Sequence, residues 1–180
     1  ELTFLKKFNF DIGIETRGDI RSQFILNFLG VKQTIGYKQA IIDNGLEFDE
    51  SLVIETMSKV DEGIKSTKLL LEMEMPPDAI FSSSDFVALG AIQEIKSRGI
   101  KIPEEICIVG FANEPFTGFM ELSITSVDQS PVEMGRIAAQ VFLEEVTNSK
   151  KVKTEKQVIL TPELMIRKSS LKSSILETIK

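Results

Sequence analysis

The sequence predicts an α/β fold in which helices flank a parallel central sheet. Short β-rich runs alternate with helical patterns through four βα units, and such alternation implies parallel strands joined by right-handed crossovers. The run from Ile106 to Phe111 is almost unbroken in its apolar character, as expected for a strand that helices cover on both faces. At 180 residues the chain is long enough to bury a core without a metal or a disulfide.

The elements of this core are expected in the following order. The expected strands are residues 11–15, 52–55, 79–81 and 106–111. The expected helices between them are residues 32–44, 61–75 and 85–98. Each helix is followed by a residue that stops it, namely Gly45, Pro76 and Gly99. No element is predicted for residues 17–30.

A further strand at residues 123–127 precedes the strongest helix start in the sequence. Ser130 is expected as N-cap, Pro131 as the first helical residue and Glu133 as the partner of Ser130 in a capping box. This helix should run to about Asn148. Two short strands, 157–160 and 164–166, are expected on either side of a proline, and the tail from Lys168 onward is expected to fray.

Composition excludes several function classes. The chain has no histidine, which excludes a Ser-His-Asp triad, a Cys-His pair and a histidine zinc site. The formal charge of −6 argues against a nucleic-acid surface, because affinity for phosphate backbones comes from clustered cations. One cysteine, Cys107, and an N-terminal segment without the apolar run of a signal peptide favour the cytoplasm, although a mature secreted protein also lacks its signal.

Ligands of open parallel sheets bind at the carboxyl ends of the strands. The candidate loops are Thr16-Arg17, Met57-Ser58, Ser82 to Asp85 and Ala112-Asn113. Asn113 is a good ligand candidate because it directly follows a buried strand. Asp85 opens a helix, where an aspartate also caps backbone N–H groups without any ligand.

Four segments, in this order and spacing, resemble the LacI/GalR family of bacterial transcription regulators, whose effector domain is periplasmic-binding-protein-like. The segments are GYKQAIIDNGLEFDESLVIE (36–55), PDAIFSSSDFVALGAIQEIKSRGIKIPEEICIVGFAN (77–113), SITSVDQSPVEMGRIAAQ (123–140) and LTPELMIRKSS (160–170). The resemblance implies two effector-binding subdomains that the chain crosses between. Residues 1–122 would be mainly the C-terminal subdomain, 123–163 a segment returning to the N-terminal subdomain, and 164–180 the final crossing and a flexible tail.

The resemblance also implies positions for effector contacts. They are Gln33, Met57, Ser58, Ser84, Asp85 and Asn113. Three family-typical groups are replaced: Gln33 stands for an arginine, Ser84 for an asparagine and Ala112 for an aspartate. We therefore expect a small polar effector, such as a sugar, bound with low affinity.

The helix from Asp85 is apolar on more than one face, and the loop that follows the Ile106 strand is rich in apolar residues. The resemblance puts both segments at a two-fold dimer surface. The expected interface residues are Phe86, Leu89, Ile92, Phe116, Phe119 and Met120. The alternative is that Phe116 and Phe119 fold back as a lid on the core.

The predicted function is the ligand-sensing and dimerisation domain of a LacI-type regulator, with DNA reached only through a module missing from this chain and with no membrane partner. A solute-binding component of a transport system shares the fold and is the alternative. A flavodoxin-like enzyme is a distant third, because the sequence has no GxGxxG motif and no P-loop, and because Glu104-Glu105 lie at the wrong end of the sheet. We expect no catalytic residue, metal or cofactor.

Overall fold

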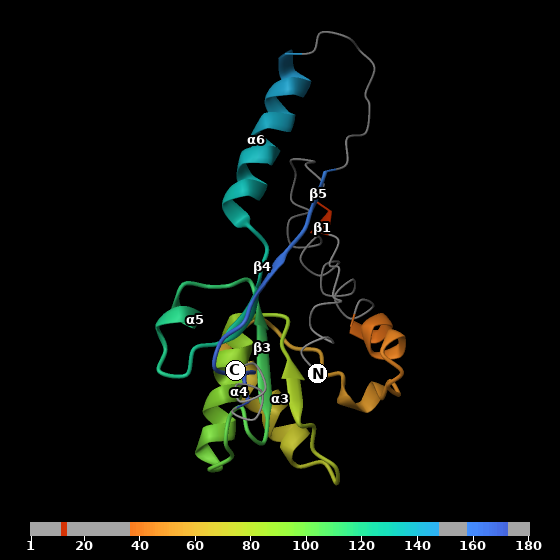
Figure 1. The fold of residues 1–180 in the computed structure, drawn as a ribbon, viewed down its shortest axis with the longest axis vertical. Coiled ribbons are helices and arrows are strands. Elements are labelled where there is room, and N and C mark those ends of the chain that lie inside the picture. The colour runs from red at the N-terminus through yellow and green to blue at the C-terminus, as the bar shows by residue number, and fades with distance from the viewer. Residues whose placement is uncertain (1–11, 14–36, 148–157, 173–180) are drawn as a thin grey trace, which may run out of the picture. The chain divides into compact units, whose positions relative to one another are not determined.

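The computed structural model describes residues 12–13, 37–147 and 158–172 (Figure 1). It divides into two compact units, which we call unit 1 (Glu1–Leu46 and Gln129–Glu163) and unit 2 (Glu47–Asp128 and Leu164–Lys180). The chain leaves unit 2 after Asp128 and returns at Leu164. The boundary at residue 163 agrees with the division given above, whereas residues 1–46 fall in unit 1 and the boundary expected at residue 122 lies at residue 128, because β4 (Thr125–Asp128) belongs to unit 2 and runs on to Asp128.

The sheet of unit 2 has the strand order β2-β3-β4-β6 (Figure 1). The strands are β2 (Ala79–Phe81), β3 (Cys107–Phe111), β4 (Thr125–Asp128) and β6 (Glu163–Met165). The pairs β2–β3 and β3–β4 are parallel, with Ile80 opposite Ile108 and Gly110 opposite Ser126. The predicted parallel sheet flanked by helices is therefore confirmed for the strands at 79–81 and 106–111.

The strand predicted at residues 52–55 is wrong. A single 3-10 turn, η1 (Glu50–Leu52), occupies its start, and residues 53–57 are not paired as a strand. The Asp49 carboxylate accepts hydrogen bonds from the backbone N–H and the hydroxyl of Ser51, at 2.9 and 2.7 Å. Such a local bond offers the backbone an alternative to a sheet, and the apolar pattern alone does not reveal it.

The strand predicted at residues 11–15 belongs to a different sheet from the one expected. Residues Ile12–Gly13 form β1, which pairs antiparallel with β5 (Ile159–Leu160) in a two-stranded sheet of unit 1. The pattern of apolar residues predicts an extended segment but carries no information about its partner. The placement of this strand in the parallel sheet was therefore wrong.

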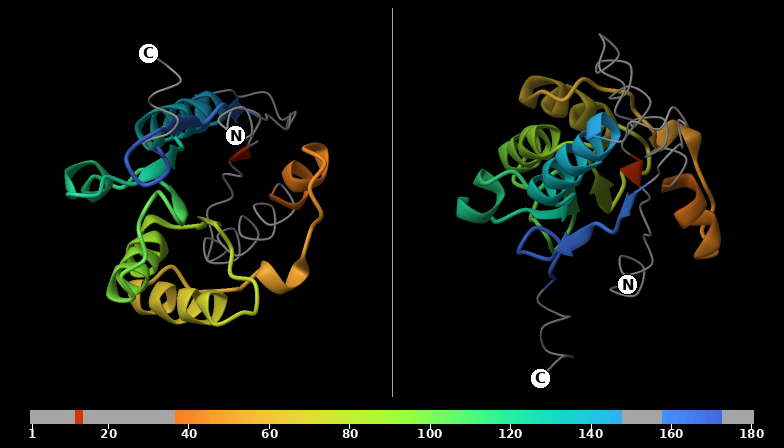
Figure 2. Two further views of the ribbon diagram at one scale, coloured as in Figure 1. Left: turned by 60° about the horizontal axis from the view of Figure 1, so that its bottom comes forward. Right: turned by 90° about the horizontal axis from the view of Figure 1, so that it is seen from above.

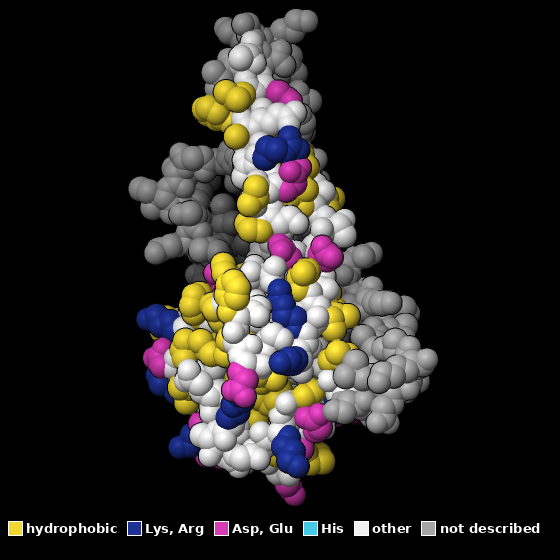
Figure 3. Space-filling model, turned by 60° about the vertical axis from the view of Figure 1, so that its left-hand side comes forward, with side chains coloured by type: hydrophobic (Ala, Val, Ile, Leu, Met, Phe, Trp, Pro, Cys, Tyr) yellow, Lys and Arg dark blue, Asp and Glu magenta, His cyan; other side chains and the backbone are white. Residues whose placement is uncertain are grey.

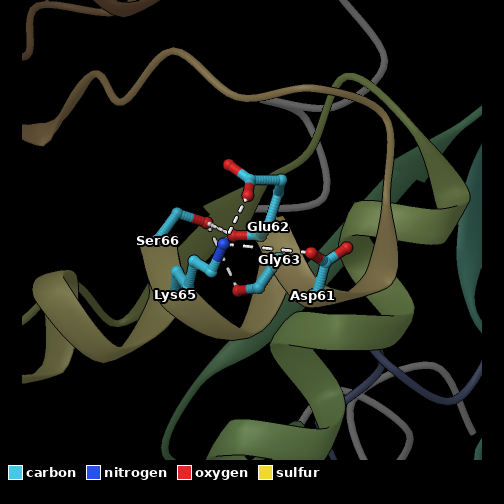
Figure 4. A network of polar contacts seen from close by, with 5 residues as sticks. All are labelled: Asp61, Glu62, Gly63, Lys65 and Ser66. Carbon is cyan, nitrogen blue, oxygen red and sulfur yellow. Dashed lines mark hydrogen bonds and ion pairs between the residues drawn. The ribbon is translucent and has the colours of Figure 1, made fainter.

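Helices α3 (Val60–Leu71) and α4 (Asp85–Ser97) lie side by side in unit 2 (Figure 2). A Cβ atom on Gly63 would collide with the backbone of Val87, and one on Gly90 would collide with the backbone of Val60. The two glycines therefore allow the helices to approach closely. The exposed side of α3 carries ion pairs instead, with Lys65 Nζ 2.8 Å from Glu62 and 3.8 Å from Asp61 (Figure 4).

One apolar cluster forms the core of unit 2. Its buried members come from α4, from β3 and the residue before it, and from the residue before β4: Ala88, Ala91, Ile92, Ile95, Ile106, Ile108 and Ile124. Helix α4 begins where predicted and ends one residue earlier, before Gly99, whose φ is +75°. The left-handed conformation of Gly99 explains why the sequence located this end well.

In unit 1 the helix α6 (Pro131–Thr147) begins at Pro131 as predicted. Ser130 has a φ of 53° rather than the extended backbone of an N-cap, and the Glu133 carboxylate binds the Arg136 guanidinium at 2.6 and 2.8 Å. Residues 37–43 are also helical, and the predicted stop at Gly45 has a φ of +72°. No helix of the described residues is long and apolar enough to cross a membrane.

The tail expected to fray from Lys168 is ordered as far as the structure describes it. Ser169 is fully buried, accepts a bond from the Thr125 N–H at 2.8 Å and donates its hydroxyl to the Ile108 carbonyl at 2.7 Å. The prediction of fraying was wrong for these residues, because serine hydroxyls can tie an irregular segment to strand backbones as well as leave it in water.

Candidate functional site

Three loops meet at the carboxyl edge of the unit 2 sheet. The segment Ser82 to Asp85 follows β2, Ala112 to Glu114 follows β3, and Asp128 ends β4. Because β2, β3 and β4 are parallel neighbours, their carboxyl ends lie at one edge. The loops predicted after residues 81 and 111 therefore come together.

The buried side chain of Asp85 links the start of α4 to the loop after β3 and to β4 through hydrogen bonds. Its side chain is 0% exposed, and its two oxygens accept from the Ser126 hydroxyl and from the Glu114 N–H, each at 2.7 Å. Asp85 is also the first residue of α4, where the helix dipole favours a carboxylate. A Cβ atom on Gly110 would collide with the Asp85 carboxylate, so only glycine fits opposite this group.

The loop after β3 turns through two residues with positive φ, Ala112 (110°) and Asn113 (54°). Asparagine tolerates this region, whereas alanine enters it rarely and under strain. The N–H groups of Ala112 and Asn113 donate to the Val127 carbonyl and the Ser126 hydroxyl, both at 3.0 Å. The Glu114 N–H donates to Asp85, so three successive backbone N–H groups of this loop donate to other residues of unit 2.

The Asn113 side chain lies between two charged residues. Its Nδ2 donates to Asp128 Oδ2 at 2.7 Å, and its Oδ1 accepts from Arg167 Nη2 at 2.7 Å. Arg167 Nη1 also donates to the Thr117 hydroxyl at 3.1 Å and to the Ile124 carbonyl at 2.8 Å. Asp128, Arg167 and Thr117 were not predicted as site residues, because the bonds that join Asn113 to Asp128, Asn113 to Arg167 and Thr117 to Arg167 span 15, 54 and 50 positions and leave no local pattern.

A family model described as a periplasmic binding protein-like domain matches residues 29–170. The chain belongs to this family. The HTH-type transcriptional regulator CelR of Thermobifida fusca is 31% identical over 141 residues, which are 78% of this chain and 41% of that protein. The HTH-type transcriptional repressor PurR of Haemophilus influenzae is 32% identical over 135 residues, 74% of this chain and 40% of that protein.

The same similarity holds in three dimensions. A solved structure of a transcriptional regulator CelR–cellobiose complex matches with a TM-score of 0.72 and 30% identity, over 78% of this chain and 42% of that one. The chain thus spans about two fifths of the length of the curated relatives it matches. These similarities confirm the resemblance to LacI-type regulators that the four segments predict.

In this periplasmic-binding-protein-like domain the predicted effector contacts fall into three groups. Ser84, Asp85 and Asn113 lie together at the carboxyl edge, but protein partners occupy their polar groups. Ser84 is buried and accepts from the Phe86 N–H at 3.3 Å as the N-cap of α4. Met57 and Ser58 precede α3, and both are exposed, Met57 to 59%. Among the described residues, neither belongs to the hydrogen-bonded group of Ser84, Asp85 and Asn113. Gln33 lies outside the described residues.

The predicted interface residues of the domain also divide. Phe119 is 87% exposed, and the ring of Phe86, 41% exposed, lies 5.2 Å from the ring of Phe116. Leu89 is half-buried. Ile92 is only 2% exposed and presents no contact surface, whereas Phe116 and Met120 are both half-buried and pack against the core. Hydrophobic side chains gather on the surface of unit 2 seen from the side where α5 (Phe116–Phe119) lies (Figure 3).

Two further features of the domain bear on ligands. An open hollow of about 400 Å³ lies at the amino end of β2, away from the candidate edge, and is lined by Asp49, Leu52 and residues 73–78. Within the part of the chain that the structure describes, no group of three or more Cys, Asp or Glu side chains is arranged to hold a metal ion.

Proposed function

We propose that this chain is the ligand-sensing and dimerisation domain of a cytoplasmic LacI-type transcriptional regulator. The observation that carries the proposal is the family match over residues 29–170, with relatives that are named transcriptional regulators. A transport component would share the fold, but the relatives reported above favour sensing. DNA recognition is assigned to a module outside these 180 residues.

The proposed effector is a small polar molecule, and a sugar is the first class to test. The CelR structure is a complex with cellobiose, and in unit 2 the side chains of Ser58 and Ser83 are exposed and that of Asp128 is half-buried. Hydroxyl and carboxylate groups suit a ligand rich in hydroxyls. Gln33, Met57 and Ser58 are the proposed direct contacts, whereas Ser84, Asp85 and Asn113 hold the loops in place.

The proposed mechanism is a shift of population between two arrangements of unit 1 and unit 2. An effector that contacts both units favours one of their relative orientations, and it shifts the equilibrium only as far as it binds that orientation better. In a dimeric regulator this orientation would set the spacing of the DNA-binding modules.

A thermal-shift screen of sugars, nucleosides and phosphorylated metabolites tests the proposal. A ligand at 100 times its Kd stabilises the folded chain by about 2.7 kcal/mol, which such a screen detects. Met57→Ala should weaken the response to any hit, whereas Met75→Ala, which changes an even more exposed methionine at the amino end of β2, should not. If no compound of these classes shifts the melting temperature, or if both variants respond equally, the assignment fails.

The proposed dimer surface consists of Phe86, Leu89, Phe116 and Phe119. An aromatic ring as exposed as that of Phe119, in the same short helix as Phe116, whose ring contacts that of Phe86, is typical of a protein contact. Phe119→Asp should yield a folded monomer, because a charge buried in such a contact has no partner. Leu69→Asp, at an exposed position of α3, is the control that should remain dimeric. Light scattering that finds a wild-type monomer at high micromolar concentration would contradict the assignment.

A further inference from the structure

Two of the three crossings between the units, those after Asp128 and before Leu164, lie close in sequence to members of one polar cluster, Asn113, Asp128 and Arg167. Asp128 is the last residue of unit 2 before the chain passes to unit 1, and Leu164 is the first residue after it returns. Arg167 follows closely in the returning segment. Since the Asn113 amide bonds both Asp128 and Arg167 at 2.7 Å, one side chain is tied to both segments.

Asparagine is suited to this place by its chemistry. The Asp128 carboxylate only accepts hydrogen bonds and the Arg167 guanidinium only donates them, so the residue between them needs a donor on one side and an acceptor on the other. The Asn113 backbone adds a second requirement, because its φ of 54° lies in the left-handed region that asparagine tolerates well. An aspartate there would face Asp128 with a second carboxylate, and an alanine would bond neither partner.

Arg167, one member of this cluster, is held by hydrogen bonds to buried residues of unit 2. Arg167 Nη1 is held by Thr117, which is fully buried and donates its hydroxyl to the Glu114 carbonyl at 2.7 Å. The Arg167 backbone N–H donates to the Thr125 hydroxyl at 2.8 Å. The returning segment is therefore anchored, and Asn113 connects the departing segment at Asp128 to this anchor.

We infer that Asn113 is a positioning residue for the hinge between the units: by tying Asp128 to Arg167 it fixes the direction in which the chain leaves and re-enters unit 2. The inference rests on the proposed sensing function for its purpose, because it limits the orientations between which an effector selects. It also connects the candidate ligand edge to the hinge, since Asn113 follows Ala112 in the loop after β3.

The test measures distances between the units in the 180-residue chain without ligand. Spin labels are attached at Leu143→Cys in α6 and Leu69→Cys in α3, two leucines of equal exposure (59%), with Cys107→Ser removing the native thiol. Loss of a hydrogen bond to a charged group changes populations by roughly tenfold to a hundredfold. In Asn113→Asp, conformers outside the wild-type distance range should increase by about that factor.

The exchanged pair Asn113→Asp with Asp128→Asn separates positioning from general stability. It reverses donor and acceptor, with Asn at 128 donating to Asp at 113 and Arg167 still bound, so the distance distribution should return to the wild-type width. Asn44→Asp is the matched control, since Asn44 also donates from its amide, to the Ala40 carbonyl at 2.8 Å, but within unit 1. This control should leave the distribution unchanged.

Two results would overturn the inference: an unchanged distribution in Asn113→Asp, or a broadened one that the exchanged pair does not restore. If Asn113→Asp fails to fold, Asp128→Ala replaces it, because this change removes the departing tie and leaves the Asn113–Arg167 bond in place. An unchanged distribution in Asp128→Ala would then refute the inference. Failure of the sensing function would appear differently, as a wild-type distribution that no compound of the screen changes.

Discussion

Replacing the buried carboxyl at the start of α4 should destabilise unit 2 more than any other single change at the candidate edge. Asp85→Ala removes the acceptor of two hydrogen bonds, from the Ser126 hydroxyl and the Glu114 N–H. A buried group left unsatisfied costs about 1–3 kcal/mol. Ser126 is fully buried and belongs at the upper end of this range, whereas half-buried Glu114 can turn to water. The expected loss is about 3–4 kcal/mol, a large part of the roughly 5–15 kcal/mol that stabilises a typical domain.

Two related variants test how the free energy of unfolding depends on the acceptor oxygens of Asp85 and on the space around its carboxylate. Asp85→Asn preserves the size of the side chain but only one of its acceptor oxygens, so it should cost about 1–2 kcal/mol. Gly110→Ala preserves Asp85 and directs a methyl group at its carboxylate, with an expected cost of about 1–3 kcal/mol from overpacking. Gly118→Ala is the control, because no atom lies within 4 Å of the added Cβ.

Urea unfolding followed by circular dichroism gives the free-energy differences, and hydrogen exchange at the Glu114 amide reports one of the bonds directly. Exchange at this amide should accelerate in Asp85→Ala and remain slow in Gly118→Ala. If Asp85→Ala unfolds within about 0.5 kcal/mol of the wild type, a value typical of surface changes, the two bonds do not stabilise unit 2 and the reasoning is refuted.

Three further predictions concern the helix contact, the tyrosine and DNA. Gly90→Ala should destabilise unit 2 by about 1–3 kcal/mol or more, because its Cβ meets the Val60 backbone; urea unfolding checks this against Gly135→Ala, where no atom lies within 4 Å and the α6 helix should be unharmed. Burial raises the pKa of Tyr37, the only tyrosine in the sequence, so its absorbance should titrate above the usual range. The unfolded chain loses that proton at lower pH, and stability should therefore fall as the pH rises past the ordinary value; a normal titration would contradict this. The 180-residue chain with its charge of −6 should not bind duplex DNA specifically, and salt-sensitive, sub-micromolar binding to a defined operator in an anisotropy assay would disprove this.

Local features made α4 and β3 predictable from the sequence. Ser84 caps α4 and Gly99 follows its end, and both residue types act within one turn of the helix. The apolar run of β3 needed only its own residues to be recognised. The position of the candidate edge followed from the alternation of these elements, before any contact was known.

Tertiary contacts account for what the sequence could not predict. β1 pairs with β5, almost 150 positions later, and nothing in residues 12–13 specifies that partner. Asp85 was expected to contact an effector or cap its own helix, and its partners lie 29 and 41 positions away. Arg167 was not singled out at all, because an arginine that binds Asn113 and Thr117 resembles a solvated one until the fold brings them together.

The late position of the segment that completes unit 2 affects how the chain can be made. β4 lies next to β6 in the sheet, and Arg167 bonds to Thr125 across 42 positions of sequence. At a synthesis rate of about 5–20 residues per second, this interval takes roughly 2–8 s. During that time the β4 edge of a nascent chain has no strand beside it, and such edges pair readily with other chains. Slower translation after Asp128 would lengthen this exposure, so the yield of folded protein should depend on how quickly the ribosome passes from Asp128 to Ser170.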